Sequence, residues 1–186
     1  IPIINGLSPI SHPAQILSDI FTIEELKKKP IKKIHVSWIG DANNVLNSLI
    51  EASVKFSFNL TIGCPKKYSP SKKTLHWAKK NNAKIFVKNN PILAVKNSDV
   101  IMTDKVISMN DKINKIKKIK EFKSFKNEKN LIKYAKKDVI LLHCLPRGNE
   151  INDEVFNSRS SKVWLQALNR VCVQKSIILY CLNKLR

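Results

Sequence analysis

Short apolar runs alternate with longer amphipathic segments along most of this 186-residue chain, and there is no internal repeat. Apolar runs of about five residues fit buried strands, whereas apolar side chains spaced three and four apart fit helices. We predict strands at residues 34–39, 58–62, 84–87, 100–103 and 139–142, and helices at 43–56, 71–81, 91–96 and 163–185, with a further short helix after Pro13. Strands separated by helices imply right-handed crossovers. The expected fold is therefore α/β: a doubly wound, mostly parallel, Rossmann-like sheet with helices on both faces, forming one domain over residues 1–186.

The strong positive charge bears on possible partners. The chain has 34 Lys and Arg against 14 Asp and Glu, a formal net charge of +20, yet only four of the basic residues are Arg. Nucleic-acid surfaces favour Arg forks and interleaved aromatic side chains, whereas here Lys is spread along the chain and aromatics make up 7%. We interpret the charge as a solvated surface and expect no nucleic-acid partner. No apolar run approaches the ~18–20 residues of a membrane span, so we expect no membrane partner either.

The cysteines and the absent motifs narrow the chemistry. Four Cys without a CxxC pair indicate reduced thiols and a cytoplasmic protein, and we interpret Cys172 and Cys181 as packing residues of the last helix. There is no HExxH motif, no Cys/His cluster and no GxGxxG loop, so we expect no metal and no cofactor. Because the chain does not begin with Met, we expect a cut or processed chain.

Polar or reactive side chains follow four of the predicted strands. These segments are residues 40–44 (GDANN), 63–65 (GCP), 103–104 (TD) and 143–147 (HCLPR). In open parallel sheets ligands bind beyond the carboxyl ends of the strands, near the point where the strand order reverses. The four segments are therefore the expected site region.

For the residues of these segments, a purely structural role is the alternative to a functional one. Cys144 lies beside His143 and near Arg147, where positive charge would favour a thiolate, or it is a buried and inert thiol. Asp104 holds an ammonium group or caps a turn. Asn43 and Asn44 bind a carboxylate at a helix N-terminus, or simply cap the helix.

Residues 112–137 form an unusually Lys-rich stretch. Ile113, Ile116, Ile119 and Phe122 recur at a spacing of three, with Lys at most of the other positions. This pattern predicts a surface helix or a mobile excursion with a thin apolar stripe. A lid over the site is the alternative, because the stretch follows residues 103–109 directly.

The motifs together resemble a known family. They are residues 5–8 (NGLS), 12–19 (HPAQILSD), 38–45 (WIGDANNV), 103–109 (TDKVISM), 143–147 (HCLPR) and 166–170 (QALNR). In this order and spacing they resemble the ornithine carbamoyltransferases, specifically the second, ornithine-binding domain of the aspartate/ornithine carbamoyltransferase family. The resemblance covers nearly the whole chain. The HCLPR segment separates it from the related aspartate enzymes, which lack this Cys.

The resemblance implies a reaction and a set of roles. Carbamoyl phosphate and L-ornithine would give L-citrulline and phosphate, as in arginine biosynthesis and the urea cycle. Cys144 and Asp104 would be catalytic. The implied ornithine-binding residues are Asn44, Asp104, Ser108 and Met109, and the implied carbamoyl-phosphate-binding residues are His12, Gln15, Cys144, Leu145 and Arg170.

The chain also departs from the family pattern. Val106 stands where Trp is usual, Asn110 where Gly is usual, and Leu168 where an acid is usual. The Ser-x-Arg-Thr-Arg phosphate loop of the family's first domain is missing, and the first Arg of the chain is Arg147. We therefore expect that the carbamoyl-phosphate-binding domain is absent from this chain and that the chain alone is inactive.

The resemblance further implies a homotrimer for the complete enzyme, in the cytoplasm or in the mitochondrial matrix of a eukaryote. Two alternatives stay open for the function. One is a carbamoyltransferase for another amine, such as putrescine. The other is a non-catalytic amino-acid-binding module that lacks the first domain.

Overall fold

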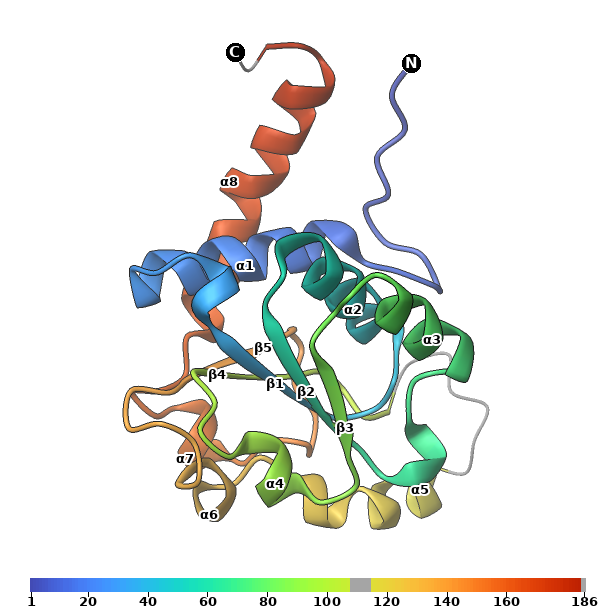
Figure 1. The fold of residues 1–186 in the computed structure, drawn as a ribbon. Helices are drawn as coiled ribbons and strands as arrows, with labels where there is room; N and C mark the ends of the chain where they lie inside the picture. Colours follow the sequence, from blue (N-terminus) through green and yellow to red (C-terminus); the bar gives the residue numbers. More distant parts are fainter. Residues whose placement is uncertain (108–114, 185–186) are drawn as a thin grey trace.

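A five-stranded parallel sheet forms the centre of the molecule, and the computed structural model describes residues 1–107 and 115–184 (Figure 1). The strands are β1 (His35–Ile39), β2 (Asn59–Gly63), β3 (Ile85–Lys88), β4 (Val100–Thr103) and β5 (Ile140–His143), in the spatial order β3-β2-β1-β4-β5. All four pairings between neighbours are parallel. The predicted fold class is confirmed.

The helices are α1 (Pro13–Lys27), α2 (Asn44–Phe56), α3 (Lys72–Lys80), α4 (Pro91–Val95), α5 (Lys115–Glu121), α6 (Lys129–Ile132), α7 (Asp153–Phe156) and α8 (Val163–Cys181). Helices α1 to α4 and α8 lie close to where the sequence predicted them. Helices α5 and α6 lie within the Lys-rich stretch, and α7 was not predicted. Side-chain caps fix several starting points: Ser71 accepts from the Thr74 N–H, and Asn90 accepts from the Ile92 N–H. Helix α8 ends at Cys181 rather than at residue 185, the predicted end.

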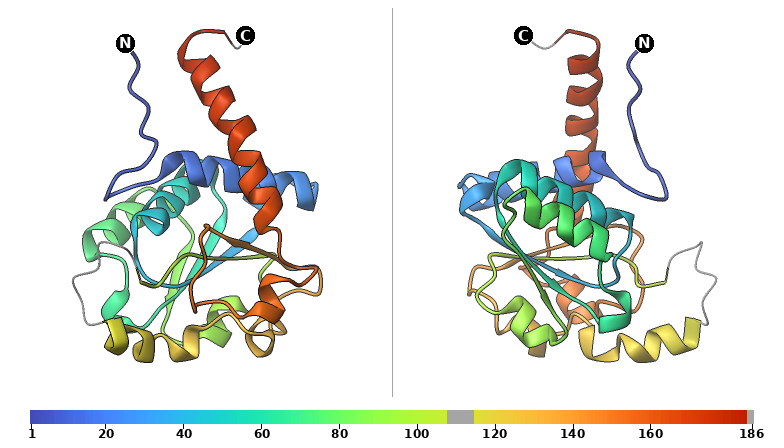
Figure 2. Two further views of the ribbon diagram at one scale, coloured as in Figure 1. Left: turned by 180° about the vertical axis from the view of Figure 1, so that it is seen from behind. Right: turned by 45° about the vertical axis from the view of Figure 1, so that its right-hand side comes forward.

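The helices cover both faces of the sheet (Figures 1 and 2). Helices α1, α2 and α3 pack on one face, where Trp38 and Leu46 belong to a single apolar core. Helices α4, α6 and α7 pack on the other face, in a second core that contains Ile101 and Leu141. Every residue of β4 and β5 is buried. Because helices cover both faces of the sheet, its central strands consist almost wholly of apolar residues.

The two edges of the sheet differ in how they are protected. Strand β3 lies at one edge and alternates between half-buried and exposed residues. Strand β5 lies at the other edge, and the segment before α8 covers it: the Leu141 N–H donates to Ser160 O at 2.8 Å, and the Lys162 N–H donates to Leu141 O at 2.9 Å. This pairing leaves β5 buried and brings α8 alongside the sheet.

In the Lys-rich stretch, the buried residues are not simply those of the apolar stripe. Ile116 and Ile119 are 68% and 45% exposed, whereas Phe122 is buried in the second core. Lys118 of α5 is also buried, and its ammonium pairs with Asp41 in the loop after β1. The prediction of a surface helix is confirmed for α5, but its apolar side chains Ile116 and Ile119 are exposed, because α5 turns the Lys118 ion pair inward instead. Ile113 lies outside the described residues.

Helix α8 extends beyond the body of the molecule (Figures 1 and 2). Its first half packs against α1, while Trp164, Leu168 and Tyr180 are each at least 65% exposed. Cys172 is exposed and Cys181 is half-buried, so the prediction that both are packing residues is wrong for Cys172. Over the described residues, we find no helix with the length and apolar character that crossing a bilayer requires.

Close packing between β2 and α4 gives a test of the fold. A Cβ atom at Gly63 would lie 2.6 Å from Ile39 Cδ1 and 2.7 Å from Ala94 Cβ. We expect Gly63→Ala to lower the free energy of unfolding by roughly 1–3 kcal/mol, because both neighbours are buried and must move. Urea denaturation measures the change. Gly6→Ala is the matched control, since nothing lies within 4 Å of its Cβ position; equal stability losses in the two variants would contradict this packing.

Candidate functional site

The strand order reverses at β1, which lies between β2 and β4. Parallel strands place their carboxyl ends at one edge, so the loop after β1 and the loop after β4 meet there. A hydrogen bond joins the two loops: Asn43 Nδ2 donates to Asp104 Oδ2 at 2.7 Å. The Thr103 hydroxyl adds a second tie by donating to Ile39 O at 2.6 Å. The candidate site is built around this reversal.

The two neighbouring asparagines have separate tasks. Asn43 caps α2, because its Oδ1 accepts from the Val45 and Leu46 N–H groups at 3.1 and 3.0 Å. The same side chain holds Asp104, so capping and site-building are combined in one residue. Asn44 begins α2, and its Nδ2 donates to Ser8 O at 2.8 Å, which fastens the N-terminal segment over the site.

Asp104 occupies a mostly buried position beyond the end of β4. Burial raises the pKa of its carboxyl, while hydrogen bonds from the Lys105 backbone N–H and from Asn43 oppose this shift. His143 lowers the same pKa through its charge. A carboxylate in such surroundings, with donors on one side, is suited to binding a cation on the other.

Cys144 lies within the electrostatic field of two carboxyl groups. Burial raises the pKa of the thiol well above its ordinary value, and Asp104 and Asp19 raise it further, against a lowering by Arg170. The expectation that positive charge favours a thiolate at Cys144 is therefore wrong, and the group is a neutral thiol near pH 7. His143 and Arg147 do not favour a thiolate, because both side chains interact with other residues.

Both of those neighbours are engaged away from the thiol. His143 Nε2 contacts Glu150 Oε1 at 2.7 Å, and both side chains are buried. Arg147 forms an ion pair with Asp153 and lies over the Phe156 ring, 4.6 Å from its centroid. Hydrogen bonds from His143 and the Gly148 N–H lower the pKa of Glu150, although burial acts to raise it. Glu150 is thus an anionic partner for His143.

A buried polar cluster beneath Cys144 joins α1, α8 and β5. Asp19 Oδ1 accepts from Gln15 Nε2 at 2.8 Å and from Gln166 Nε2 at 2.7 Å. Gln166 Oε1 in turn accepts the His143 N–H at 2.9 Å, at the start of the HCLPR segment. Burial raises the pKa of Asp19 to about 7, which the two amide hydrogen bonds and Arg170 only partly offset. The second oxygen of Asp19 is buried and has no partner among the described residues.

His12 and Arg170 lie on the same side of the site. His12 precedes α1 and is buried, with its backbone N–H donating to Ser48 Oγ at 2.8 Å. Burial and the charge of Arg170 lower the pKa of His12, so its imidazole is neutral near pH 7. Arg170 of α8 is half-buried and acts electrostatically on His12, Asp19 and Cys144.

The structure thus places most of the predicted site residues together. His12, Gln15, Asp104, Cys144 and Arg170 are linked by hydrogen bonds or charge interactions through Asp19. Asn44 neighbours this group through Asn43, and Leu145 is 40% exposed beside Cys144. Ser108 and Met109 lie outside the described residues, as do residues 112–114 of the stretch for which a lid was considered. Within residues 1–107 and 115–184, no three His, Cys, Asp or Glu side chains gather as metal ligands.

Three site residues were not identified from the sequence. Asp19 and Gln166 stood inside matched motifs without a role, and Glu150 was not considered. A signal existed for Asp19, because it lies four residues after Gln15 on a helix and such pairs face one another. No spacing rule indicates Glu150, since its contact with His143 depends on the turn after β5.

The fold and this edge define a doubly wound α/β domain with polar and reactive side chains gathered at the reversal of its strand order. The family described as aspartate/ornithine carbamoyltransferase, Asp/Orn binding domain, matches residues 32–181. The chain belongs to this family.

Relatives of known name cover nearly the whole chain. The ornithine carbamoyltransferase of Pyrococcus horikoshii is 40% identical over 184 residues, which is 96% of this chain and 58% of that protein. The crystal structure of the anabolic ornithine carbamoyltransferase of Campylobacter jejuni superposes with a TM-score of 0.91 at 37% identity, covering 98% of this chain and 62% of that one. The Pyrococcus furiosus ornithine carbamoyltransferase gives 0.88 at 40% identity. The chain spans about three-fifths of the length of these relatives.

The buried carboxyl of Asp19 predicts a pH-dependent stability. Its pKa is raised from 3.8 to about 7 in the folded chain, so its contribution is complete below the unfolded value and is lost as the pH rises through 7. Relative to Asp19→Asn, the native chain should lose roughly 2–3 kcal/mol of unfolding free energy between about pH 5 and pH 8.

Urea denaturation at several pH values measures this difference. Asp138→Asn is the control, because Lys27 lowers the pKa of this exposed carboxyl below 3.8, so its contribution should not change between pH 5 and pH 8. If D19N and the native chain respond to pH alike, Asp19 is not held in the buried state described above.

Proposed function

We propose that this chain is the ornithine-binding domain of an ornithine carbamoyltransferase, which transfers the carbamoyl group of carbamoyl phosphate to L-ornithine in arginine biosynthesis. One observation carries the proposal. The Asp104 carboxylate, held by Asn43 at the reversal of strand order, faces the same region as Cys144 and Arg170. The names of the relatives at 40% identity agree with this chemistry.

The two ends of ornithine match different parts of the site. A carboxylate is favoured near Asn44 at the N-terminus of α2, where the helix dipole favours anions. An ammonium group is favoured at Asp104, which has hydrogen-bond donors on one side only. Ser108 and Met109 complete the ornithine pocket in this proposal, on the strength of the motif alone.

The reaction needs the δ-amine in its neutral form. An amine of this kind has a free pKa near that of Lys, about 10.4, so the site must favour loss of one proton. In the step itself, the amine nitrogen bonds to the carbamoyl carbon and the carbon–oxygen bond to phosphate breaks. The proton lost by the amine leaves with the phosphate product. Asp104 and Cys144 orient the amine, and a neutral Cys144 thiol can donate to it or accept from it.

The carbamoyl group and its phosphate lie on the other side of the site in this proposal. The neutral imidazole of His12, the Gln15 amide and Arg170 supply donors for the developing oxyanion and the leaving phosphate. Leu145 contributes its backbone to the carbamoyl group. Holding both substrates in line would account for much of the rate.

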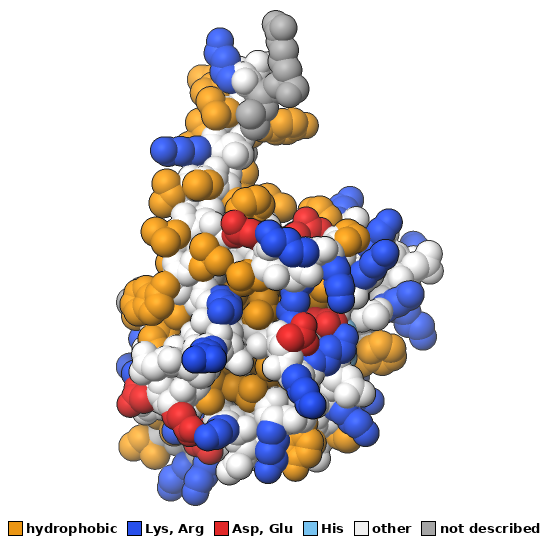
Figure 3. All heavy atoms as spheres, turned by 90° about the vertical axis from the view of Figure 1, so that its left-hand side faces the viewer, with side chains coloured by type: hydrophobic (Ala, Val, Ile, Leu, Met, Phe, Trp, Pro, Cys, Tyr) orange, Lys and Arg blue, Asp and Glu red, His pale blue; other side chains and the backbone are white. Residues whose placement is uncertain are grey.

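The remaining two-fifths of the relatives' length has no counterpart in this chain. We assign the remaining phosphate-binding groups to that part, because Arg170 and a neutral His12 do not balance a phosphate dianion. The exposed apolar side chains of α8 offer a surface for such a part (Figure 3). A homotrimeric complete enzyme in the cytoplasm, or in a mitochondrial matrix, follows from the resemblance.

Putrescine is the second candidate acceptor, and the affinities of the chain for L-ornithine and putrescine distinguish the two. Putrescine lacks the carboxylate that the Asn44 region would hold, so L-ornithine should bind the chain more tightly than putrescine. Asp104→Asn should weaken L-ornithine at least tenfold, because a hydrogen-bonded charge contributes about 1.5–3 kcal/mol. Isothermal titration calorimetry measures both. Asp138→Asn removes the same charge at the opposite edge of the sheet and should leave affinity unchanged; tighter putrescine binding would favour the alternative amine.

Measurements of turnover test the assignment of the remaining phosphate-binding groups to the part of the relatives that has no counterpart in this chain. We expect no citrulline from this chain alone, but citrulline from a chimaera in which this chain replaces the matching three-fifths of the Pyrococcus furiosus enzyme. Cys144→Ala in the chimaera should lower kcat by about 10²–10⁴-fold, the range of a positioned proton-transfer group. Cys172→Ala, at an exposed position of α8, is the control. Citrulline formation by the isolated chain, or an unchanged kcat in C144A, would overturn the corresponding assignment.

A further inference from the structure

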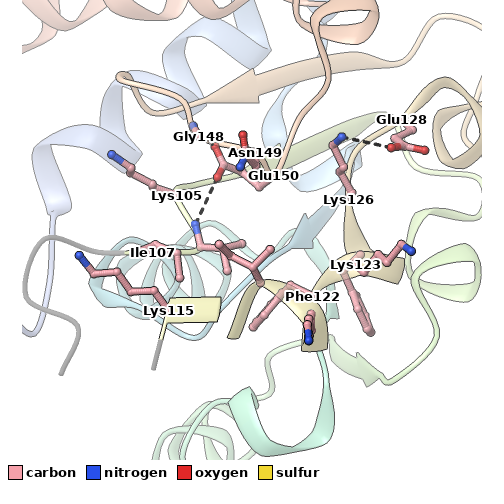
Figure 4. A pocket seen from close by; sticks show the side chains of 14 residues that line it. Lys105, Ile107, Lys115, Phe122, Lys123, Lys126, Glu128, Gly148, Asn149 and Glu150 are labelled. Carbon is pink, nitrogen blue, oxygen red and sulfur yellow. Dashed lines mark hydrogen bonds and ion pairs between the residues drawn. The ribbon is translucent and has the colours of Figure 1, made fainter. Parts of the chain in front are cut away.

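A cavity of about 710 Å³ lies between the residues that follow β4 and helix α5 (Figure 4). Its described walls are the residues just after Asp104, helix α5 with the turn that follows it, and the loop at residues 148–150. Of the predicted binding residues that the structure describes, none belongs to these walls. The volume falls within the range of small-molecule sites, about 300–1,000 Å³.

The inner surface of this cavity is apolar. Val106, Phe122 and Phe125 are each at most 7% exposed and form its floor, with Ile107 and Ile119 beside them. The two Phe rings pack edge to face with centroids 6.2 Å apart, which gives the floor a fixed shape. An apolar group placed here would leave water and contact several side chains at once.

The rim of the cavity is strongly basic. Figure 4 shows Lys105 and Lys115 on one side of it and Lys123 and Lys126 on the other. Lys105, Lys115, Lys120 and Lys123 form no ion pair with any residue in the described part of the chain. The two acids of the lining are already engaged, since Glu128 pairs with Lys126 and Glu150 bonds to His143 and to the Val106 N–H. Among the described residues, no acid therefore offsets the charge of these four lysines.

We propose that this cavity binds an amphiphilic organic anion, with an aliphatic or aromatic body on the Val106–Phe122–Phe125 floor and a carboxylate at the lysine rim. An apolar floor beneath unpaired ammonium groups complements such a ligand in both parts. Lysines act as point charges rather than planar forks, which suits a single anionic head group. The described walls do not include Asn44, Asp104 or Cys144, and this proposal does not rest on the assignment of those residues to ornithine.

Octanoate is the probe. Two control compounds each lack one of its features, the charge or the apolar body. We expect isothermal titration to show saturable binding of one octanoate per chain. 1-Octanol, which lacks the charge, should bind at least fivefold more weakly, and acetate, which lacks the apolar body, should show no binding. Equal binding of octanol, or the absence of saturable octanoate binding, would overturn the proposal.

Two substitutions place the ligand in this cavity. The double variant Lys120→Glu, Lys123→Glu should weaken octanoate about tenfold, because it reverses charge at the rim. The double variant Lys72→Glu, Lys73→Glu makes the same charge change on exposed residues of α3, across the sheet, and should leave affinity unchanged. Equal effects of the two would show general charge attraction and refute a built site.

Val106→Trp fills the floor with a side chain that the family resemblance allows at this position, and it should abolish octanoate binding. Circular dichroism checks that the variant is folded. If it is not, Ile119→Trp serves instead, because Ile119 is 45% exposed and lines the same cavity. Undiminished binding by a folded, filled variant would exclude this cavity as the site.

Discussion

Parallel pairing of all five strands is the constraint on which the site depends. It sends every carboxyl end to one edge, and the return of the chain from β3 to β4 across β1 opens the crevice there. Asn43 then fixes the geometry of the crevice, because the side chain that caps α2 also holds Asp104. A capping residue elsewhere would leave the Asp104 carboxyl without this donor, so local helix chemistry and site chemistry are inseparable at this point.

Burial sets the charge states in the crevice. Burial raises the pKa of Asp19, Asp104 and Cys144. The charge of Asp104 raises the pKa of Asp19 and of Cys144 further, and the charge of Glu150 does the same for Asp104. Arg170 opposes these shifts in Asp19 and Cys144 and lowers the pKa of His12. The result is a site with a neutral thiol and a neutral imidazole near pH 7. Such groups exchange hydrogen bonds with a substrate without repelling its charges.

The molecule has two surfaces of different kinds. Lys side chains are scattered over the body, in keeping with a solvated basic surface, whereas apolar side chains follow α8 where it leaves the body (Figure 3). On its other side, α8 supplies Gln166 to the cluster beneath Cys144. Helix α8 therefore connects the interior of the site to the surface that we assign to the remaining part of a complete enzyme.

The sequence alone determined the strands, most of the helices and the edge at which the site lies, because each depends on local apolar spacing and on the direction of parallel strands. It offered helix capping as one of two interpretations of Asn43, and the structure shows the cap. It did not determine that Lys118 is buried against Asp41, or that Glu150 holds His143, since these contacts join segments that only packing brings together. The protonation state of Cys144 was decided in the same way. Its sequence neighbours His143 and Arg147 indicated a thiolate, but the folded chain turns both away and surrounds the thiol with buried carboxyl groups from other elements.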